Sequence, residues 1–372
     1  MRLGIDATFF GSSQPTGLGI YTCNMINALI RIHKKTEIWA SRDYEFSIDP
    51  AQLHLVLQRL PGLERYAYLL RPLWMETIFP KQLRESKIDI LYSPVPGGMR
   101  HCPVPHLVTV HDLTPIAVPG DSPAPVVWNF RYRLPRILQN AAAVIAVSQH
   151  TKNDICSFYG IDENKIHVIH GAYSQAHFFP EIDPESLDRF GLEGLPYILA
   201  IGSANHRKNF SRLLKAISRI KNNITHHLVI AGPRSPAENR KIQKKAGQLG
   251  ISDRLHLLPY LSNKELRALY SSADLFVYPS LYEGFGIPVL EAMACGTPVL
   301  AANTSSIPEV AGNAALLIDP NDTESIASGI IQIITNHDVI KYYTRLGLKR
   351  IQNFSWENSA NRLIKLISTI KT

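Results

Sequence analysis

The sequence predicts two doubly wound α/β domains, each built on a parallel sheet. Short, continuously apolar runs such as Leu-Val-Ile-Ala (228–231) alternate with helical stretches along the chain. Runs of this kind suit strands that are buried on both faces of a parallel sheet. About a dozen of them are present, too many for one sheet of the usual size. The length, 372 residues, is likewise sufficient for two domains.

The expected strands fall into two groups, separated by a stretch without periodicity. The residues after His170 are rich in Gly and Pro, and a new strand begins at Tyr197, so we expect domains at residues 1–175 and 176–355. Apolar positions in residues 356–372 predict a final helix. In chain order, the expected strands are Met1–Asp6, Glu37–Ala40, Ile88–Tyr92, His106–Val110, Val144–Val147, Lys165–Ile169, Tyr197–Ile201, His227–Ala231, Arg254–Leu258, Leu275–Tyr278, Pro298–Ala301 and Ala315–Ile318.

The composition points to a cytoplasmic protein. No apolar run reaches the 18 or so residues of a membrane span. The N-terminal residues lack the apolar stretch and cleavage site of a signal peptide. The four cysteines are scattered without a C-x-x-C pair, which supports neither a disulfide framework nor a zinc site.

The net charge predicts an anionic partner. The formal charge is +8 and the pI is near 9.2, which fits nucleotide phosphates, an anionic membrane surface or nucleic acid. We expect the positive charge to be spread along the chain, since no compact Lys/Arg block is evident.

The strongest local signal for chemistry lies between a strand and a helix. Gly284 and Gly286 let the backbone pass close to a ligand, and Pro288 suits the first turn of a helix. Glu283 precedes that helix and Glu291 lies inside it. Two carboxylates so placed could accept hydrogen bonds from two sets of hydroxyls on one ligand, close to a helix N-terminus that attracts anions. The alternative is a capped helix start with an exposed glutamate.

A second glycine pair follows the first strand. Gly17 and Gly19 precede a helical pattern, where backbone amides could cradle a phosphate. The third glycine of the dinucleotide fingerprint is absent, because Thr22 occupies its position. A plain turn explains the pair equally well.

Two adjacent cations follow another strand. Arg207 and Lys208 combine a forked donor with a point charge, a pair suited to a diphosphate. Because cations at a helix N-terminus oppose its dipole, we expect an anion to offset their cost. A solvated helix start is the alternative.

A histidine stands at the C-terminal end of another strand, where α/β sheets place ligands. His111 could bind a sugar hydroxyl or move a proton, although a structural role is the more common one for a single histidine. Asp112 beside it could cap the next segment or fix the imidazole tautomer.

Two segments of the first domain interleave aromatic residues with arginines, as membrane-interface surfaces do. They cover residues 65–74 and 128–136. Ordinary amphipathic packing is the alternative.

Several motifs together resemble one family. The chain resembles, over essentially its whole length, the retaining glycosyltransferases of family four, whose two Rossmann-like domains face a cleft in the architecture called GT-B. The resemblance rests on Gly17-Leu-Gly19, Val110-His-Asp-Leu, Ala143-Val-Ile-Ala-Val-Ser-Gln-His-Thr, Arg207-Lys-Asn, Glu283-Gly-Phe-Gly-Ile-Pro-Val-Leu-Glu291 with its continuation Ala292-Met-Ala-Cys-Gly-Thr-Pro-Val, and Phe354-Ser-Trp356.

This resemblance implies a role for each matching residue. Glu291 would hold the ribose of a nucleotide, and Glu283 would grip the donor sugar together with the amides of Gly284, Phe285 and Gly286. Lys208 and Arg207 would neutralise the diphosphate, which Gly17 and Gly19 would approach from the other domain. His111 would contact the sugar near the reacting centre, so that His111 and Glu283 are the candidate catalytic residues. The helix 356–372 would complete the first domain.

The resemblance also implies the donor and the chemistry. Many members carry an arginine five positions before the lysine, where this chain has Ser203. The Arg-Lys-Asn version resembles bacterial mannosyltransferases, which favours GDP-mannose as donor and a glycan or lipid-linked acceptor. The sequence contains no Asp-x-Asp motif, so neither a metal nor a cofactor is expected, and a same-face displacement would retain the anomeric configuration.

Other functions remain open at this stage. A UDP-sugar transferase, a nucleotide-sugar hydrolase or an epimerase could use the same architecture. A dinucleotide-dependent oxidoreductase would leave Glu283 and Glu291 unexplained. A nucleic-acid-binding protein is suggested by charge alone, without aromatic stacking or a recognised module.

Overall fold

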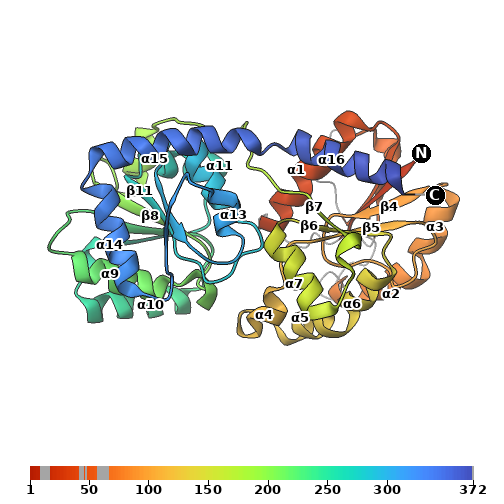
Figure 1. Ribbon diagram of the computed structural model, residues 1–372, viewed down its shortest axis with the longest axis horizontal. Helices are drawn as coiled ribbons and strands as arrows, with labels where there is room; N and C mark the ends of the chain where they lie inside the picture. Colours follow the sequence, from red (N-terminus) through yellow and green to blue (C-terminus); the bar gives the residue numbers. More distant parts are fainter. Residues whose placement is uncertain (9–16, 42–45, 47, 57–66, 371–372) are drawn as a thin grey trace. The chain divides into compact units, whose positions relative to one another are not determined.

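The computed structural model describes residues 1–8, 17–41, 46, 48–56 and 67–370, and the chain divides into two compact units (Figure 1). Unit 1 consists of Met1–Ala172 with Ser355–Thr372, and unit 2 of Tyr173–Phe354. Each unit is a parallel α/β sheet with its own hydrophobic core. Among the helices described, none is both long and apolar enough to span a membrane.

Unit 1 contains a seven-stranded sheet in the order β3-β2-β1-β4-β5-β6-β7, all strands parallel. The strand order reverses between β1 and β4. Doubly wound sheets bind ligands at such a position, outside the carboxyl ends of the strands. The strands are β1 (Leu3–Ala7), β2 (Thr36–Ala40), β3 (Leu53–Leu55), β4 (Ile90–Ser93), β5 (His106–Val110), β6 (Ala143–Ala146) and β7 (Ile166–Val168).

The helices of unit 1 include the C-terminal one. Trp356 begins α16, and its ring lies edge-on to Tyr21 of α1, with the ring centroids 5.1 Å apart. The Ser359 hydroxyl donates to the carbonyl of His170 at 2.7 Å. The helices are α1 (Gly17–Ile32), α2 (Ala67–Thr77), α3 (Phe79–Glu85), α4 (Thr114–Ala117), α5 (Ala124–Trp128), α6 (Leu134–Asn140), α7 (Gln149–Tyr159) and α16 (Trp356–Thr369), with a π-helical turn, η4 (Asn129–Arg133), between α5 and α6.

Unit 2 contains a six-stranded parallel sheet in the order β10-β9-β8-β11-β12-β13. Numbered from its own first strand this is 3-2-1-4-5-6, the order of the dinucleotide-binding fold. The strands are β8 (Tyr197–Ile201), β9 (His227–Ala231), β10 (Leu255–Leu258), β11 (Leu275–Tyr278), β12 (Val299–Ala302) and β13 (Leu316–Ile318).

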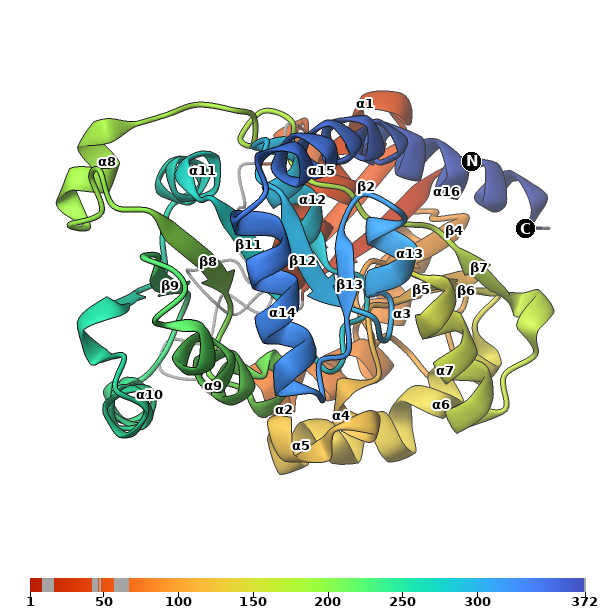
Figure 2. The ribbon, with the colours of Figure 1, turned by 60° about the vertical axis from the view of Figure 1, so that its left-hand side comes forward.

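Helices α9, α10 and α14 share one core with one face of this sheet, as the amphipathic pattern of α9 requires. Figure 2 shows α14 in front of the strands with α9 and α10 beside it. The helices of unit 2 are α8 (Pro184–Arg189), α9 (Phe210–Ile220), α10 (Pro236–Leu249), α11 (Asn263–Ser272), α12 (Ile287–Ala294), α13 (Ile307–Ala311), α14 (Thr323–Ile334) and α15 (His337–Arg350).

The structure confirms the predicted fold class. Each of the twelve expected strands is present, with ends that differ by at most two residues. The sequence analysis missed β3, a three-residue strand at the sheet edge that follows a 3-10 turn opened by Pro50. Its segment, Leu-His-Leu, is too short for alternation to distinguish it from a loop.

Candidate active site

Two cationic side chains of unit 2 converge on one carboxylate. The Lys208 ammonium donates to Oε1 of Glu283 at 2.6 Å, and the Arg207 guanidinium lies 2.8 Å from Oε2. Burial alone would raise the pKa of Glu283, but the charges of Lys208 and Arg207 outweigh it and hold the pKa at about 2. The three groups together carry a charge of +1, which suits an anionic ligand.

The two cations lie between a strand and a helix, as expected. Arg207 and Lys208 are in a 3-10 turn (His206–Lys208) that precedes α9. Glu283, from the loop after β11, is the anion that offsets their charge. The sequence analysis had assigned these residues to separate parts of a ligand and did not foresee that they pair with one another.

Lys208 is held in place by residues that sequence reasoning did not single out. Its ammonium donates to the Tyr278 hydroxyl at 2.8 Å and lies 4.7 Å from the centre of that ring. Gly202, at φ +152°, lies against the stem of Lys208, where an added Cβ would be 3.0 Å from Cδ. A side chain at Gly202 would therefore displace the lysine.

The glycine loop that follows Glu283 is fixed by two serines. The Ser305 hydroxyl accepts the Glu283 amide at 3.0 Å, and Ser306 donates to the carbonyls of Glu283 and Phe285, both at 2.9 Å. Gly286, at φ +107°, begins α12, and a Cβ there would lie 2.9 Å from Ile307. The predicted glycine requirement thus has a structural reason at Gly286.

Glu291 is the second glutamate of this region and has the opposite electrostatic environment. It lies in α12 and is 5% exposed. Tyr270 of α11 donates to its Oε2 at 3.1 Å. Burial raises the pKa of Glu291 to about 7, although the Tyr270 hydrogen bond acts in the opposite direction. The protonation state of Glu291 therefore changes with pH near neutrality.

His111 of unit 1 is a neutral imidazole with a fixed tautomer. Its Nε2 lies 2.7 Å from the carbonyl oxygen of Pro94, which can only accept, so Nε2 carries the proton and Nδ1 presents a lone pair. Burial lowers its pKa to about 4, against the opposing effects of the Pro94 carbonyl and Asp112. Asp112 accepts the amide of Thr114, the first residue of α4, at 2.8 Å, while the N-cap position is Leu113. The backbone, rather than Asp112, sets the tautomer.

Gly17 and Gly19 lie within the first turn of α1, and not in a loop before the helix. The predicted loop continues back to Pro15 and Thr16, which are outside the described residues. Gly17 is exposed and Gly19 is buried. A Cβ on Gly17 would meet no described atom within 4 Å, so packing within the described residues does not require glycine there.

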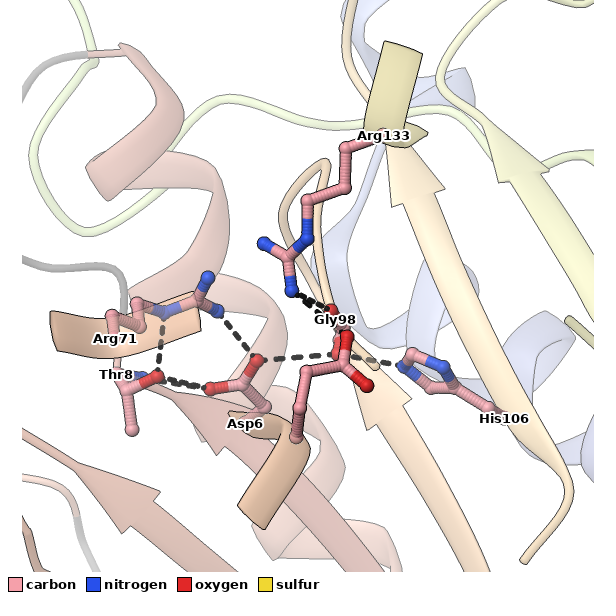
Figure 3. A network of polar contacts seen from close by, with 8 residues as sticks. Asp6, Thr8, Arg71, Gly98, His106 and Arg133 are labelled. Carbon is pink, nitrogen blue, oxygen red and sulfur yellow. Dashed lines mark hydrogen bonds and ion pairs between the residues drawn. The ribbon is translucent and has the colours of Figure 1, made fainter. Parts of the chain in front are cut away.

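A buried polar network in unit 1 had no counterpart in the sequence analysis (Figure 3). Arg71 donates to Oδ2 of Asp6 at 2.8 Å and to the Thr8 hydroxyl at 2.9 Å. Ser93 joins Asp6 to His106. These contacts link α2 to β1, β4 and β5 at the sheet on which His111 stands.

The network removes two side chains of one predicted membrane segment from the surface, whereas Leu73 of that segment is exposed. In residues 65–74, Arg71 is 8% exposed and paired with Asp6, and Trp74 is buried; residues 65 and 66 lie outside the described residues. Burial of these two side chains in the domain rules out their lying at a membrane surface. In the second segment, Trp128 and Tyr132 are exposed, with their ring centroids 5.8 Å apart.

The residues described contain no group of three or more His, Cys, Asp or Glu side chains that could hold a metal ion.

Two family models match the chain. The model described as "Glycosyltransferase Family 4" matches residues 15–174, and "Glycosyl transferases group 1" matches residues 184–350. O-antigen chain mannosyltransferase B of Escherichia coli is 31% identical over 292 residues, 76% of this chain and 74% of that protein. O-antigen chain mannosyltransferase RfbU of Salmonella typhimurium is 32% identical over 236 residues, 63% of each chain.

Solved structures share the fold at lower identity. Sucrose-phosphate synthase of Thermosynechococcus elongatus has a TM-score of 0.77 and 18% identity, covering 99% of this chain and 98% of that one. HepE of Anabaena, solved with UDP and glucose, has a TM-score of 0.75 and 16% identity, covering 99% and 100%. With the matches to both family models, these likenesses show that the chain has the GT-B fold and belongs to the group 1, family 4 glycosyltransferases.

Proposed function

We propose that this glycosyltransferase moves mannose from GDP-mannose to a glycan or lipid-linked acceptor, with retention of configuration and without a metal ion. The observation that carries the proposal is the group formed by half-buried Arg207 with buried Lys208 and Glu283, whose net charge of +1 complements a diphosphate while its carboxylate can accept sugar hydroxyls.

Each group of unit 2 has a separate role in this proposal. Arg207 and Lys208 bind the diphosphate and stabilise the charge that develops on it as the sugar leaves. Glu283, with the backbone of Gly284, Phe285 and Gly286, orients the sugar. Glu291 accepts the ribose hydroxyls, for which its carboxylate must be ionised.

Unit 1 would supply further donor contacts. The Nδ1 lone pair of His111 is suited to accept a hydrogen bond from a donor-sugar hydroxyl, since Nε2 is committed to Pro94. With a pKa of about 4, the imidazole is neutral at physiological pH and adds no charge to the site. Gly17 and Gly19 would approach the diphosphate with the first amides of α1, which have no partners inside the helix.

The transfer step in this proposal requires no protein base. The acceptor oxygen forms its bond to the anomeric carbon on the face from which the diphosphate departs. The carbon–oxygen bond to the diphosphate breaks, and the released phosphate oxygen takes the acceptor's proton. Retention follows from attack on the face that the leaving group vacates.

Mannose is favoured by two observations. The relatives named above are O-antigen mannosyltransferases at about 30% identity, and the Arg207-Lys208-Asn209 sequence resembles that group. The HepE complex with UDP and glucose makes a UDP-sugar the second candidate. Thermal-shift measurements with GDP, UDP, ADP and their sugars test the choice, because saturating ligand raises stability by a few kcal/mol. A shift with UDP-sugars alone would overturn GDP-mannose.

A hydrolase or epimerase acting on a nucleotide sugar would show the same donor binding. Product analysis separates them, since only the transferase needs an acceptor for turnover.

We also propose that the enzyme works in the cytoplasm, in polysaccharide biosynthesis, with peripheral contact to the membrane.

A further inference from the structure

The positive charge of this chain is concentrated in one stretch of unit 2. Residues 205–250 contain eleven Lys and Arg residues and one acidic residue, a net charge of +10. Since the whole chain has 39 basic and 31 acidic residues, the remainder carries −2. The expectation that the charge is spread along the chain is therefore wrong.

The reason that no basic block is evident in the sequence is structural. In α9 and α10 the basic residues are separated by apolar ones, such as Leu213, Ile217 and Ile242, which fill the core of unit 2. Folding turns these apolar residues inward and leaves basic residues of both helices, such as Lys215 and Lys244, exposed. The two helices lie side by side, and the Ser218 hydroxyl of α9 donates to the carbonyl of Leu249 in α10 at 2.8 Å.

Helix α10 presents four basic side chains on the face opposite its buried one. Ile242 and Ala246 are buried in the core. At about 100° per residue, the basic positions centre on the opposite side of the helix. They are Arg240, Lys241, Lys244 and Lys245, which we call the α10 basic face; all are exposed except Lys245, which is half-buried.

Most of the charge of this face is not neutralised within the fold. Across the described part of the chain, none of its four side chains forms an ion pair within 4.0 Å of a carboxylate; the pKa of Glu238 is lowered first by its hydrogen bonds with Ser235 and also by the charge of Lys241. Glu238 is the one acidic residue of α10, and its Oε2 accepts the amide and the hydroxyl of Ser235, both at 2.7 Å. That capping box anchors the start of the helix and so fixes the orientation of the basic face.

We propose that the α10 basic face docks on an anionic phospholipid surface. Four cations on the exposed side of α10 can meet a plane of phosphate headgroups together. The one exposed apolar residue near this face within α10 after its first position is the small Ala237, so the contact would be electrostatic, reversible and sensitive to salt, without insertion into the acyl region. Helix α10 also has no aromatic residue to stack on nucleic-acid bases, which favours the lipid surface.

This inference rests on the peripheral membrane contact proposed above and names its surface; it does not depend on the donor chemistry. The predicted membrane contact had relied on arginines of unit 1, of which Arg71 and Arg133 are paired with carboxylates. We now assign the electrostatic part of that contact to unit 2.

The test compares two triple variants in the same unit. One is Lys241→Gln/Lys244→Gln/Lys245→Gln on α10, and the matched control, with the same loss of charge from exposed positions of α15, is Lys341→Gln/Arg345→Gln/Lys349→Gln. Gln has nearly the helix propensity of Lys and Arg. Both proteins should therefore fold, which the melting temperature and the nucleotide-induced thermal shift check.

Binding is measured by co-sedimentation with phosphatidylcholine vesicles, with and without phosphatidylglycerol, at low and high salt. The parent should bind only the anionic vesicles, and only at low salt. Each basic residue at the surface contributes about fivefold, so the α10 variant should lose on the order of a hundredfold and the α15 variant only a few-fold. Equal losses in both variants, or binding that resists salt, would overturn the proposal. The proposal would also be overturned if the α10 variant lost binding to duplex DNA but kept binding to the vesicles, because the face would then bind nucleic acid.

Discussion

The Tyr270 hydroxyl donates a hydrogen bond of 3.1 Å to Oε2 of Glu291, and both groups are buried in unit 2. Within the described residues it is the one hydrogen bond to this carboxylate. Glu283 differs, because two cations hold its charge. One glutamate is therefore firmly ionised while the other titrates near neutral pH, and several predictions depend on this difference.

The stability of the unliganded protein should fall between about pH 4.5 and 7 through Glu291. Its pKa is raised from 4.5 to about 7 in the folded state, so the folded protein binds the proton more tightly than the unfolded chain does. The contribution of Glu291 to the free energy of unfolding is fully present below pH 4.5 and is lost as pH rises through 7. The free energy of unfolding changes by roughly 3 kcal/mol over this range. Chemical unfolding of Glu291→Gln across this range should show a smaller decline than the parent. Parallel pH profiles would contradict the raised pKa.

Tyr270→Phe should shift nucleotide binding to higher pH. The variant removes the hydrogen bond that favours ionised Glu291, so the pKa of Glu291 rises further. In the proposed donor site the ribose is bound by ionised Glu291, so affinity near neutral pH should fall and recover in more alkaline buffer. Calorimetry over a pH series measures this. Weaker binding by the same factor at every pH would instead indicate a purely structural role for Tyr270.

The sequence predicted the strands better than it predicted the contacts within the site. Buried parallel strands give continuous apolar runs, which can be recognised locally, whereas β3 is too short to show a pattern. Glu283 and Lys208 were each recognised from glycine and charge patterns at strand ends. Their ion pair joins residues 75 positions apart, and no local pattern reports such a pairing.

The residues that contact Glu291 and Lys208 could not be recognised in the sequence, for a related reason. Tyr270 and Tyr278 are aromatic residues in apolar surroundings, and by sequence they are indistinguishable from ordinary core. Only the arrangement of α11 against α12, and of β11 beside the turn before α9, turns their hydroxyls toward Glu291 and Lys208.

His111→Ala should lower kcat and kcat/KM together if the imidazole acts mainly in the transition state. Because its pKa is about 4, the imidazole should add no titration to the rate profile above about pH 5. Steady-state kinetics across pH measures both effects. Unchanged turnover in a folded variant would assign His111 to packing against Tyr21, whose ring lies edge-on with the centroids 4.4 Å apart.

Sugar transfer should persist in excess EDTA, because Arg207, Lys208 and a helix N-terminus are proposed to meet the charge of the leaving diphosphate. Initial rates with and without chelator provide the measurement. Activity that EDTA abolishes and Mn²⁺ restores would contradict the metal-independent mechanism.

Replacing each of the two glutamates by glutamine should change different kinetic parameters. The ribose is far from the breaking bond and is gripped equally in ground and transition states, so Glu291→Gln should raise the donor KM with a smaller loss of kcat. Glu283→Gln should mainly lower kcat. It also leaves Lys208 and Arg207 without their carboxylate, so the unliganded variant should melt at a lower temperature than the parent and still bind free nucleotide diphosphate well.

Calorimetric titration of the bare nucleotide diphosphate into both variants tests the assigned donor site most directly. A hydrogen bond to a charged group contributes roughly 1.5–3 kcal/mol, about ten- to more than a hundredfold in affinity. We predict a loss of that size in Glu291→Gln at a pH where the parent carboxylate is ionised, and retained affinity in Glu283→Gln. Parent-like binding by Glu291→Gln would contradict the ribose assignment and with it the proposed donor site.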